Sequence, residues 1–136
     1  MKTWLVIALA ALSSACVPVY KTLQPAAQVQ VLDEQGQALN DAQVTLISSA
    51  YPYGREQFRT EATTRGDGTA TFYKVKDFRI EVLMLHGSQE FFWNWCVSKS
   101  GYQTFRTEYR NSDMFSSQLQ VKLQAGESTA CPVPAY

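Results

Sequence analysis

The side chains that most often carry out catalysis are scarce in this chain of 136 residues. His86 is the only histidine, so a metal site built from two or three imidazoles is excluded within one chain. No G-x-S-x-G segment occurs, in which a serine nucleophile would stand on an exposed elbow. Asp33, Asp67 and Asp113 carry the oxygen ligands that calcium prefers, but their spacing matches no calcium-binding loop. The sequence therefore predicts no enzyme, no metal site and no cofactor, with His86 as a turn residue at a strand end.

Cys16 is the residue whose surroundings point most clearly to a chemical modification. It follows a basic start at Lys2, an apolar run over residues 4–12 and the small residues Ser13 to Ala15. This order is typical of a secretory signal peptide, and the apolar run is too short to cross a bilayer, which takes about 20 residues. With a cysteine directly after the small residues, the segment resembles a bacterial lipoprotein signal. The resemblance implies cleavage after Ala15 and acylation of the Cys16 thiol, although Ser13 stands where that family's pattern favours leucine.

The same resemblance implies where the mature chain is held. Two or more acyl chains anchor a protein stably in a bilayer. Val17, rather than aspartate, follows the cysteine, which in such lipoproteins implies sorting to the outer membrane. The expected location is the cell envelope, on the periplasmic face of the outer membrane. The alternative is an ordinary signal peptide cut near Ala15, in which Cys16 is incidental.

The cysteine count is consistent with export. The chain has three cysteines, Cys16, Cys96 and Cys131. If Cys16 is acylated, the other two form an even pair in an oxidising compartment. We therefore predict a Cys96–Cys131 disulfide that ties the C-terminal tail to a core strand, and a loop of this size adds roughly 3–4 kcal/mol to stability. The alternative is two unpaired thiols, one of them buried.

An aromatic segment over residues 90–97 allows two interpretations. In the first, Trp93 and Trp95 face the core from a central strand, with Phe92 and Cys96 on the opposite side, because aromatic residues pack well on a pleated sheet. In the second, Phe91, Phe92 or Trp93 lies on an open face and binds a glycan, a peptide or a partner lipoprotein, because contiguous exposed aromatic residues mark interaction sites.

A second candidate for binding is the loop over residues 49–55. It contains Tyr51, Tyr53 and Arg55, and tyrosine and arginine are favoured at binding surfaces. The alternative is a plain connection between strands that packs its rings inward. The candidate ligand-binding residues are therefore Tyr51, Tyr53, Arg55, Phe92 and Trp93.

The charge balance bears on the class of partner. The chain has 12 Lys+Arg against 12 Asp+Glu, and loss of Lys2 with the leader makes the mature chain slightly acidic. Neither nucleic acid nor an anionic lipid surface is favoured by this balance. The expected partners are the membrane that holds the anchor and a protein or glycan of the envelope.

Period-two alternation of apolar and polar residues begins at Ala27 and predicts half-buried strands with one face on a core. The alternating apolar positions are Val29 and Val31; Ala42, Val44 and Leu46; Ala70 and Phe72; Phe78, Ile80, Val82 and Met84; and Leu119, Val121 and Leu123. Turn-forming residues over 33–36, 65–68, 86–88 and 100–101 separate these runs. Residues 16–26 hold two prolines and little periodicity, and we predict a tether there. No long helix is expected after the leader, and residues 108–117 are assigned either a short helical turn or a loop.

Three segments follow a common pattern in order along the chain. Residues 29–46 read V-x-V-x-D-x-x-G-x-A and then A-x-V-x-L, with Ala38 where proline is usual. Residues 63–72 contain T-x-x-x-G-x-x-x-F, and residues 97–102 end in Gly-Tyr. Together they resemble the carboxypeptidase regulatory-like domain. That resemblance implies a small transthyretin-like β-sandwich and an accessory or binding role, without chemistry of its own.

The expected fold is all-β, a single antiparallel sandwich of about seven strands, transthyretin-like or Ig-like, over residues 27–124. A signal peptide (1–15) and an acylated tether (16–26) precede the sandwich, and a disulfide-tied tail (125–136) follows it. The expected function is that of a non-enzymatic envelope lipoprotein that acts as an accessory or binding module in the periplasm. Two alternatives are a carbohydrate- or peptidoglycan-binding module that uses exposed aromatic residues, and a small envelope enzyme or enzyme inhibitor.

Overall fold

The structure is a computed structural model that describes residues 16–82 and 87–134. In these two ranges the chain forms nine β-strands and one short 3₁₀-helix, and no α-helix, so the all-β fold class is confirmed. The elements are β1 (Cys16–Gln24), β2 (Ala27–Leu32), β3 (Gln43–Tyr51), β4 (Arg55–Thr63), β5 (Thr69–Phe72), β6 (Val75–Val82), β7 (Glu90–Ser98), β8 (Phe105–Arg106), η1 (Ser112–Met114) and β9 (Gln118–Lys122).

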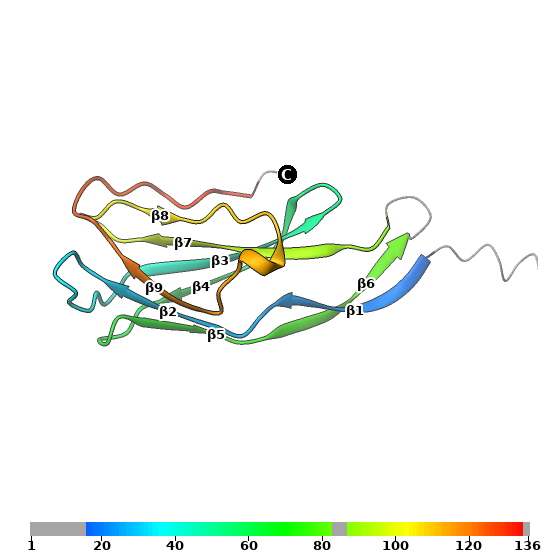
Figure 1. Cartoon of the computed structure of the whole chain (residues 1–136), viewed down its shortest axis with the longest axis horizontal. Coiled ribbons are helices and arrows are strands. Elements are labelled where there is room, and N and C mark those ends of the chain that lie inside the picture. The colour runs from blue at the N-terminus through cyan, green and yellow to red at the C-terminus, as the bar shows by residue number, and fades with distance from the viewer. Residues whose placement is uncertain (1–15, 83–86, 135–136) are drawn as a thin grey trace, which may run out of the picture.

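The described strands form three sheets, where the sequence predicted one sandwich of about seven strands (Figure 1). β1 and β6 make a two-stranded ribbon, β5, β2 and β9 a three-stranded sheet, and β4, β3, β7 and β8 a four-stranded sheet. Neighbouring strands run antiparallel, except that β2 and β9 run parallel. The ribbon continues the β2–β5 pair beyond the body, since β1 leads into β2 and β5 leads into β6.

The main core lies between the three-stranded and the four-stranded sheet. Val29 and Val31 of β2 and Phe72 of β5 pack there with Leu46 of β3 and Trp95 of β7, and each is at most 2% exposed. The rings of Phe72 and Trp95 meet edge to face, with centroids 5.4 Å apart. For these strands the period-two pattern correctly predicts which side chains are buried.

Strand β1 occupies the segment for which the sequence predicted a tether. Cys16–Gln24 pairs antiparallel with β6 along its length, with one irregularity near Thr22. Both strands of a two-stranded ribbon are edge strands, where a proline such as Pro18 is tolerated. Pro18 therefore gave a misleading signal of irregular chain, whereas Pro25 lies in the break between β1 and β2.

Strand β6 also departs from expectation, because its alternation does not face a core. Phe78 and Ile80 are 66% and 72% exposed, whereas Glu81 between them and the strand end is only 3% exposed. The reason is that β6 pairs with β1 alone, and only the opposite face of the ribbon turns toward the body. Met84, predicted to belong to the same apolar face, lies outside the described residues.

The base of the ribbon is fixed to the body by a second, smaller cluster. Leu23 of β1 is buried there with Ala50 of β3 and Phe91 of β7. The indole Nε1 of Trp93 donates a hydrogen bond of 2.8 Å to the carbonyl oxygen of Leu23. The ribbon is therefore joined to the four-stranded sheet as well as to β2 and β5.

The turn after β2 has the predicted chemistry. The Asp33 Oδ1 atom accepts hydrogen bonds from the backbone amides of Gln35 and Gln37, at 2.9 and 2.8 Å. Gly36 has a φ of 82°, in the left-handed region that favours glycine. Asp33 is thus a turn residue.

The predicted Cys96–Cys131 disulfide is confirmed. It joins the outward side of β7 to the C-terminal tail, as expected if Cys96 points away from the core. Arg59 Nη2 also donates to the carbonyl oxygen of Pro132 at 2.9 Å. The tail is therefore held across the outer face of the four-stranded sheet.

Candidate binding groove on the four-stranded sheet

Two of the predicted aromatic residues meet on the outer face of the four-stranded sheet, away from the core. In the β3–β7 pairing, Tyr51 lies opposite Glu90 and Ser49 lies opposite Phe92, and these positions share one face of the sheet. The rings of Tyr51 and Phe92 have centroids 5.1 Å apart. Phe92 is 7% exposed and Tyr51 is 37% exposed, so Tyr51 carries most of the accessible ring surface.

A hollow of about 430 Å³ adjoins this ring pair. On one side it is lined by β3 and β7, through Tyr51, Glu90 and residues 91–93. On the other side it is lined by residues 110–113, the last two of which belong to η1. Its walls thus combine aromatic rings with one cationic and two acidic side chains.

The segment that forms the second wall is positioned by Asn94 of β7. The Asn94 Oδ1 atom accepts hydrogen bonds from the Thr107 hydroxyl at 2.9 Å and from the Tyr109 amide at 2.6 Å. Its Nδ2 donates to the carbonyl oxygen of Tyr109 at 3.0 Å. The backbone pairing of β7 with β8 ends at Arg106. Beyond it, the side chain of Asn94 holds residues 107–109 beside the edge of β7.

A second hollow of about 300 Å³ continues the first along the same face. Both are lined by Phe92 and Arg110, and the second extends over Ile47 and Asn94 to Pro132 of the tail. We call the two together the outer groove. The disulfide-tied tail closes its far end.

The charged side chains of the outer groove are available to a ligand. Within the described part of the chain, neither Arg110 nor Glu90 nor Asp113 takes part in an ion pair or a side-chain hydrogen bond. Arg110 offers a planar set of donors that fits carboxylate or phosphate groups. The two carboxylates accept hydrogen bonds from hydroxyl or amide groups.

Trp93 belongs to the core more than to the groove. Its ring is half-buried, its Nε1 is bonded to Leu23, and it meets Phe115 edge to face with centroids 5.6 Å apart. Trp95 is 1% exposed. The core interpretation of the aromatic segment is therefore correct for Trp95 and largely so for Trp93, while Phe92 lines the groove.

Tyr53 and Arg55 lie in the β3–β4 hairpin, beside the groove but outside its two hollows. The Arg55 guanidinium stands 5.6 Å from the centre of the Tyr53 ring. Tyr53 lines a smaller hollow of about 120 Å³ that it shares with Tyr51 and Pro52. The Tyr51–Pro52 peptide bond in this hairpin is cis. Of the five predicted binding residues, the structure thus brings Tyr51, Phe92 and Trp93 together and places the other two nearby.

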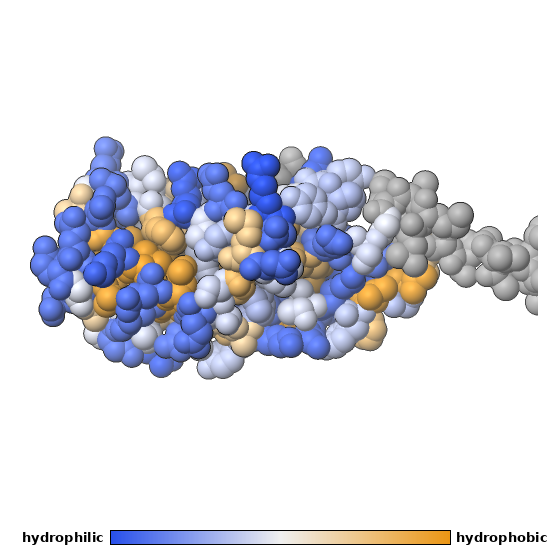
Figure 2. Space-filling view, viewed as in Figure 1, coloured by the Kyte–Doolittle hydropathy of each residue, from blue (hydrophilic) through white to orange (hydrophobic). Residues whose placement is uncertain are grey.

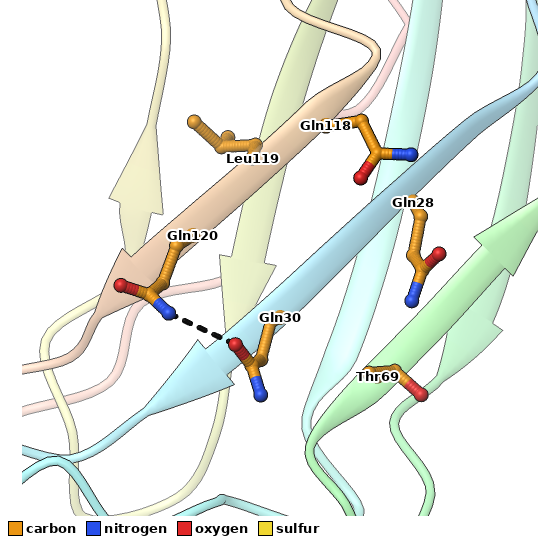
Figure 3. Close-up of a pocket in the computed structure, with 6 residues that line it drawn as sticks. All are labelled: Gln28, Gln30, Thr69, Gln118, Leu119 and Gln120. Atoms are coloured by element: carbon orange, nitrogen blue, oxygen red, sulfur yellow. Dashed lines mark hydrogen bonds between the residues drawn. The ribbon is translucent and has the colours of Figure 1, made fainter.

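A separate shallow hollow, of about 280 Å³, lies on the outer face of the three-stranded sheet (Figure 3). Amide side chains dominate its lining, which consists of Gln28, Gln30, Thr69, Gln118, Leu119 and Gln120. The Nε2 of Gln120 donates to the Oε1 of Gln30 at 2.9 Å. This hollow contains no titratable group, so it is suited to hydrogen bonding only.

Glu81 is the buried carboxylate of the described chain, and it joins the ribbon to the body. Its Oε1 lies 3.0 Å from Lys21 Nζ and accepts a hydrogen bond of 2.7 Å from the backbone amide of Gln89. Burial by itself raises the pKa of Glu81, but the Gln89 amide and the Lys21 ammonium together outweigh it and lower the pKa below that of an ordinary glutamate. Glu81 is therefore a charged structural contact.

Two other residues that the sequence singled out for possible chemistry, Asp67 and Cys16, lie outside the groove. Asp67 is exposed, and hydrogen bonds from the hydroxyl and amide of Thr69 lower its pKa, as suits a turn residue. Cys16 is an exposed cysteine outside the disulfide. No cluster of three metal-ligating side chains occurs in residues 16–82 and 87–134. His86 and the leader predicted for residues 1–15 lie outside the described residues.

Within the described ranges, no helix has the length and apolar character needed to span a bilayer. Comparison of the chain with protein-family models, with curated proteins and with solved structures gives no match.

Proposed function

We propose that this protein is a non-enzymatic, lipid-anchored module of the cell envelope that binds a partner in the outer groove. The observation that carries this proposal is the set of side chains that line the 430 Å³ hollow. There the exposed ring of Tyr51 lies beside the side chains of Arg110, Glu90 and Asp113, which have no partner among the described residues. Binding sites typically combine apolar rings with a few orienting polar groups in this way.

The construction of the groove supports binding by a preorganised surface. One wall is a pair of central strands, the second is held by three hydrogen bonds with Asn94, and the far end is lined by Pro132 of the tail, which the Cys96–Cys131 disulfide holds in place. A surface that is already ordered loses little conformational freedom when a ligand binds. Such a site does not require the ligand to fold it.

The proposed anchor is an acyl group on Cys16, at the periplasmic face of the outer membrane. Support comes from the leader-like order of residues 1–15 and from the exposed Cys16 thiol at the start of β1. For the fold, we propose that the two larger sheets correspond to a transthyretin-like or Ig-like sandwich, extended by the ribbon. The support is the shared core between these sheets and the order of the sequence motifs.

A glycan of the envelope is the ligand class that the groove favours. A sugar ring presents an apolar face that can stack on Tyr51, and its hydroxyl groups can donate to Glu90 and Asp113. Arg110 would pair with a carboxylate such as one of those on the stem peptides of peptidoglycan. A protein partner that presents an acidic residue beside an apolar one is the second candidate, because it would use the same side chains.

Isothermal titration of the protein with soluble peptidoglycan fragments tests this assignment. We expect saturable binding that weakens by about tenfold in Tyr51→Ala and in Arg110→Ala, since these residues would be central contacts. Tyr73→Ala is the matched control, because Tyr73 is 78% exposed and lies outside the groove. Binding that is absent, or that is equally strong in all three variants, would refute the glycan assignment.

A further inference from the structure

The ribbon carries an uncovered apolar face formed by cross-strand pairs. Pro18 pairs with Ile80 and Tyr20 pairs with Phe78, so all four side chains lie on one side of the ribbon. Tyr20, Phe78 and Ile80 are 56%, 66% and 72% exposed, and the two rings have centroids 4.9 Å apart. We call these four residues the apolar ribbon face. Figure 2 shows hydrophobic side chains gathered at this end of the molecule.

This face has no structural use within the described chain. The opposite side of the ribbon makes the contacts with the body, through Lys21, Leu23 and Glu81. Single exposed apolar residues are common on soluble proteins, but contiguous groups mark sites of contact with another surface. The position of Cys16, the residue proposed to carry the anchor, indicates which surface that is.

Cys16 lies on the same side of the ribbon as the apolar ribbon face. It pairs with Val82, two residues before Pro18, and residues two apart on a strand point to the same side. At a rise of about 3.3 Å per residue, Cys16 is about 13 Å along the strand from Tyr20. Because β1 is paired with β6 from Cys16 onward, no flexible segment separates an acyl group on Cys16 from this face.

We infer that the apolar ribbon face rests on the bilayer that holds the anchor, at the level of the lipid headgroups; this rests on the proposed acylation of Cys16. The chemistry of the face fits that depth, since tyrosine and other amphipathic rings are enriched at membrane interfaces. Lys76 Nζ lies 5.5 Å from the centre of the Tyr20 ring. An ammonium at the border of an apolar surface remains hydrated and pairs with lipid phosphate.

Quenching by brominated lipids tests the inference on the mature chain. The protein is purified from membranes in detergent, its acylation is checked by intact mass, and it is reconstituted in vesicles of phosphatidylethanolamine and phosphatidylglycerol. A tryptophan is introduced by Phe78→Trp, and by Val133→Trp as a control, because Val133 is 83% exposed in the C-terminal tail. We expect blue-shifted emission and loss of emission with brominated acyl chains for Phe78→Trp only, measured against the unsubstituted chain.

The possible outcomes separate this inference from the anchor. An acylated chain in which Phe78→Trp is quenched no more than Val133→Trp overturns the contact and leaves the anchor intact. A dimer in sedimentation, with the introduced tryptophan shielded from lipid, assigns the face to a second copy and also overturns the inference. An unmodified Cys16 shows in the mass alone, and the inference then fails together with the anchor. Titration of the groove with glycan is independent of all three results.

A paired substitution provides a second test that does not depend on a probe. Phe78→Ser together with Ile80→Ser replaces two exposed side chains, so the fold is expected to persist, and circular dichroism checks this. We expect the acylated double variant to lose protection of β6 amides from hydrogen exchange on vesicles, relative to the parent chain. Equal protection in both chains contradicts contact between this face and lipid.

Discussion

Gly68 lies at a position where only glycine fits, for two independent reasons. Its φ is 74°, and a Cβ atom placed on it would lie 2.5 Å from the carbonyl oxygen of Val31. The nearby Gly66 has open space where its Cβ would be. The two glycines lie in the same turn, but a Cβ atom would clash with the backbone only at Gly68.

We expect Gly68→Ala to lower the free energy of unfolding by roughly 1–3 kcal/mol, because the backbone of a buried strand cannot move away without loss of pairing. Gly66→Ala is the control and should change the same free energy by less than about 0.5 kcal/mol. Urea denaturation of both variants measures the difference. Equal effects of the two substitutions would contradict this account of the turn.

Glu81 links the stability of the molecule to pH. Its pKa is lowered in the folded state, so its charged form stabilises the fold above the unfolded value of about 4.3, and this contribution disappears as the pH falls through the folded value. Glu81→Gln should cost about 1–3 kcal/mol at pH 7, because a hydrogen-bonded charge is lost beside Lys21. Thermal unfolding of the wild type and of Glu81→Gln, from pH 7 to pH 3, measures the difference in their stability.

The stabilities of wild type and Glu81→Gln should converge toward low pH, where the carboxyl of Glu81 in the wild type is protonated. Glu61→Gln is the matched control, since Glu61 is exposed and outside the ion pairs of the described chain. A constant difference between wild type and Glu81→Gln across the pH range would contradict the ionised contact.

At the scale of elements, the C-terminal tail depends on one covalent bond for its position. The bond joins Cys96 in β7 to Cys131, 35 residues later, and the tail closes one end of the outer groove. We expect Cys131→Ser to lower stability by about 2–4 kcal/mol. Hydrogen exchange should show faster exchange in residues 127–134 and little change in β2. Unaltered tail protection would show that non-covalent contacts are sufficient.

The sequence predicts the strands well where a second sheet covers them, and poorly where none does. Val29, Val44 and Phe72 alternate because one side of each strand meets the shared core. The same alternation at Phe78 and Ile80 has no such cause, and only tertiary pairing with β1 reveals which side is covered. Periodicity identifies two faces of a strand but does not tell which face is buried when the partners are distant in the chain.

The candidate groove was predictable in its aromatic residues and not in its charged ones. Tyr51 and Phe92 are recognisable by residue type. Arg110 and Asp113 come from a segment without periodicity, and Asn94 brings that segment to β7 through side-chain bonds that leave no pattern in the sequence. The disulfide was predictable from cysteine parity once Cys16 is set aside as the acylated residue, because that argument needs no three-dimensional information.

At the scale of the whole molecule, the mass of the mature chain reports on two proposals at once. We expect a chain that begins at Cys16, carries acyl groups on that residue, and is two hydrogens lighter than the reduced form because of the Cys96–Cys131 bond. Intact mass spectrometry before and after reduction measures both features. A start at any other residue, or a free thiol at Cys16, would contradict the anchor while leaving the disulfide unaffected.

The parallel pairing of β2 with β9 has a consequence for biogenesis. Gln30 and Gln120 face each other although 90 residues separate them, so β2 has an open edge until nearly the whole chain has been synthesised. Contacts of this span form late and slow the search for the native topology. A polypeptide truncated before residue 118 would lack β9 and would leave that edge of β2 unpaired. The native order of the three-stranded sheet can therefore form only after β9 has been made.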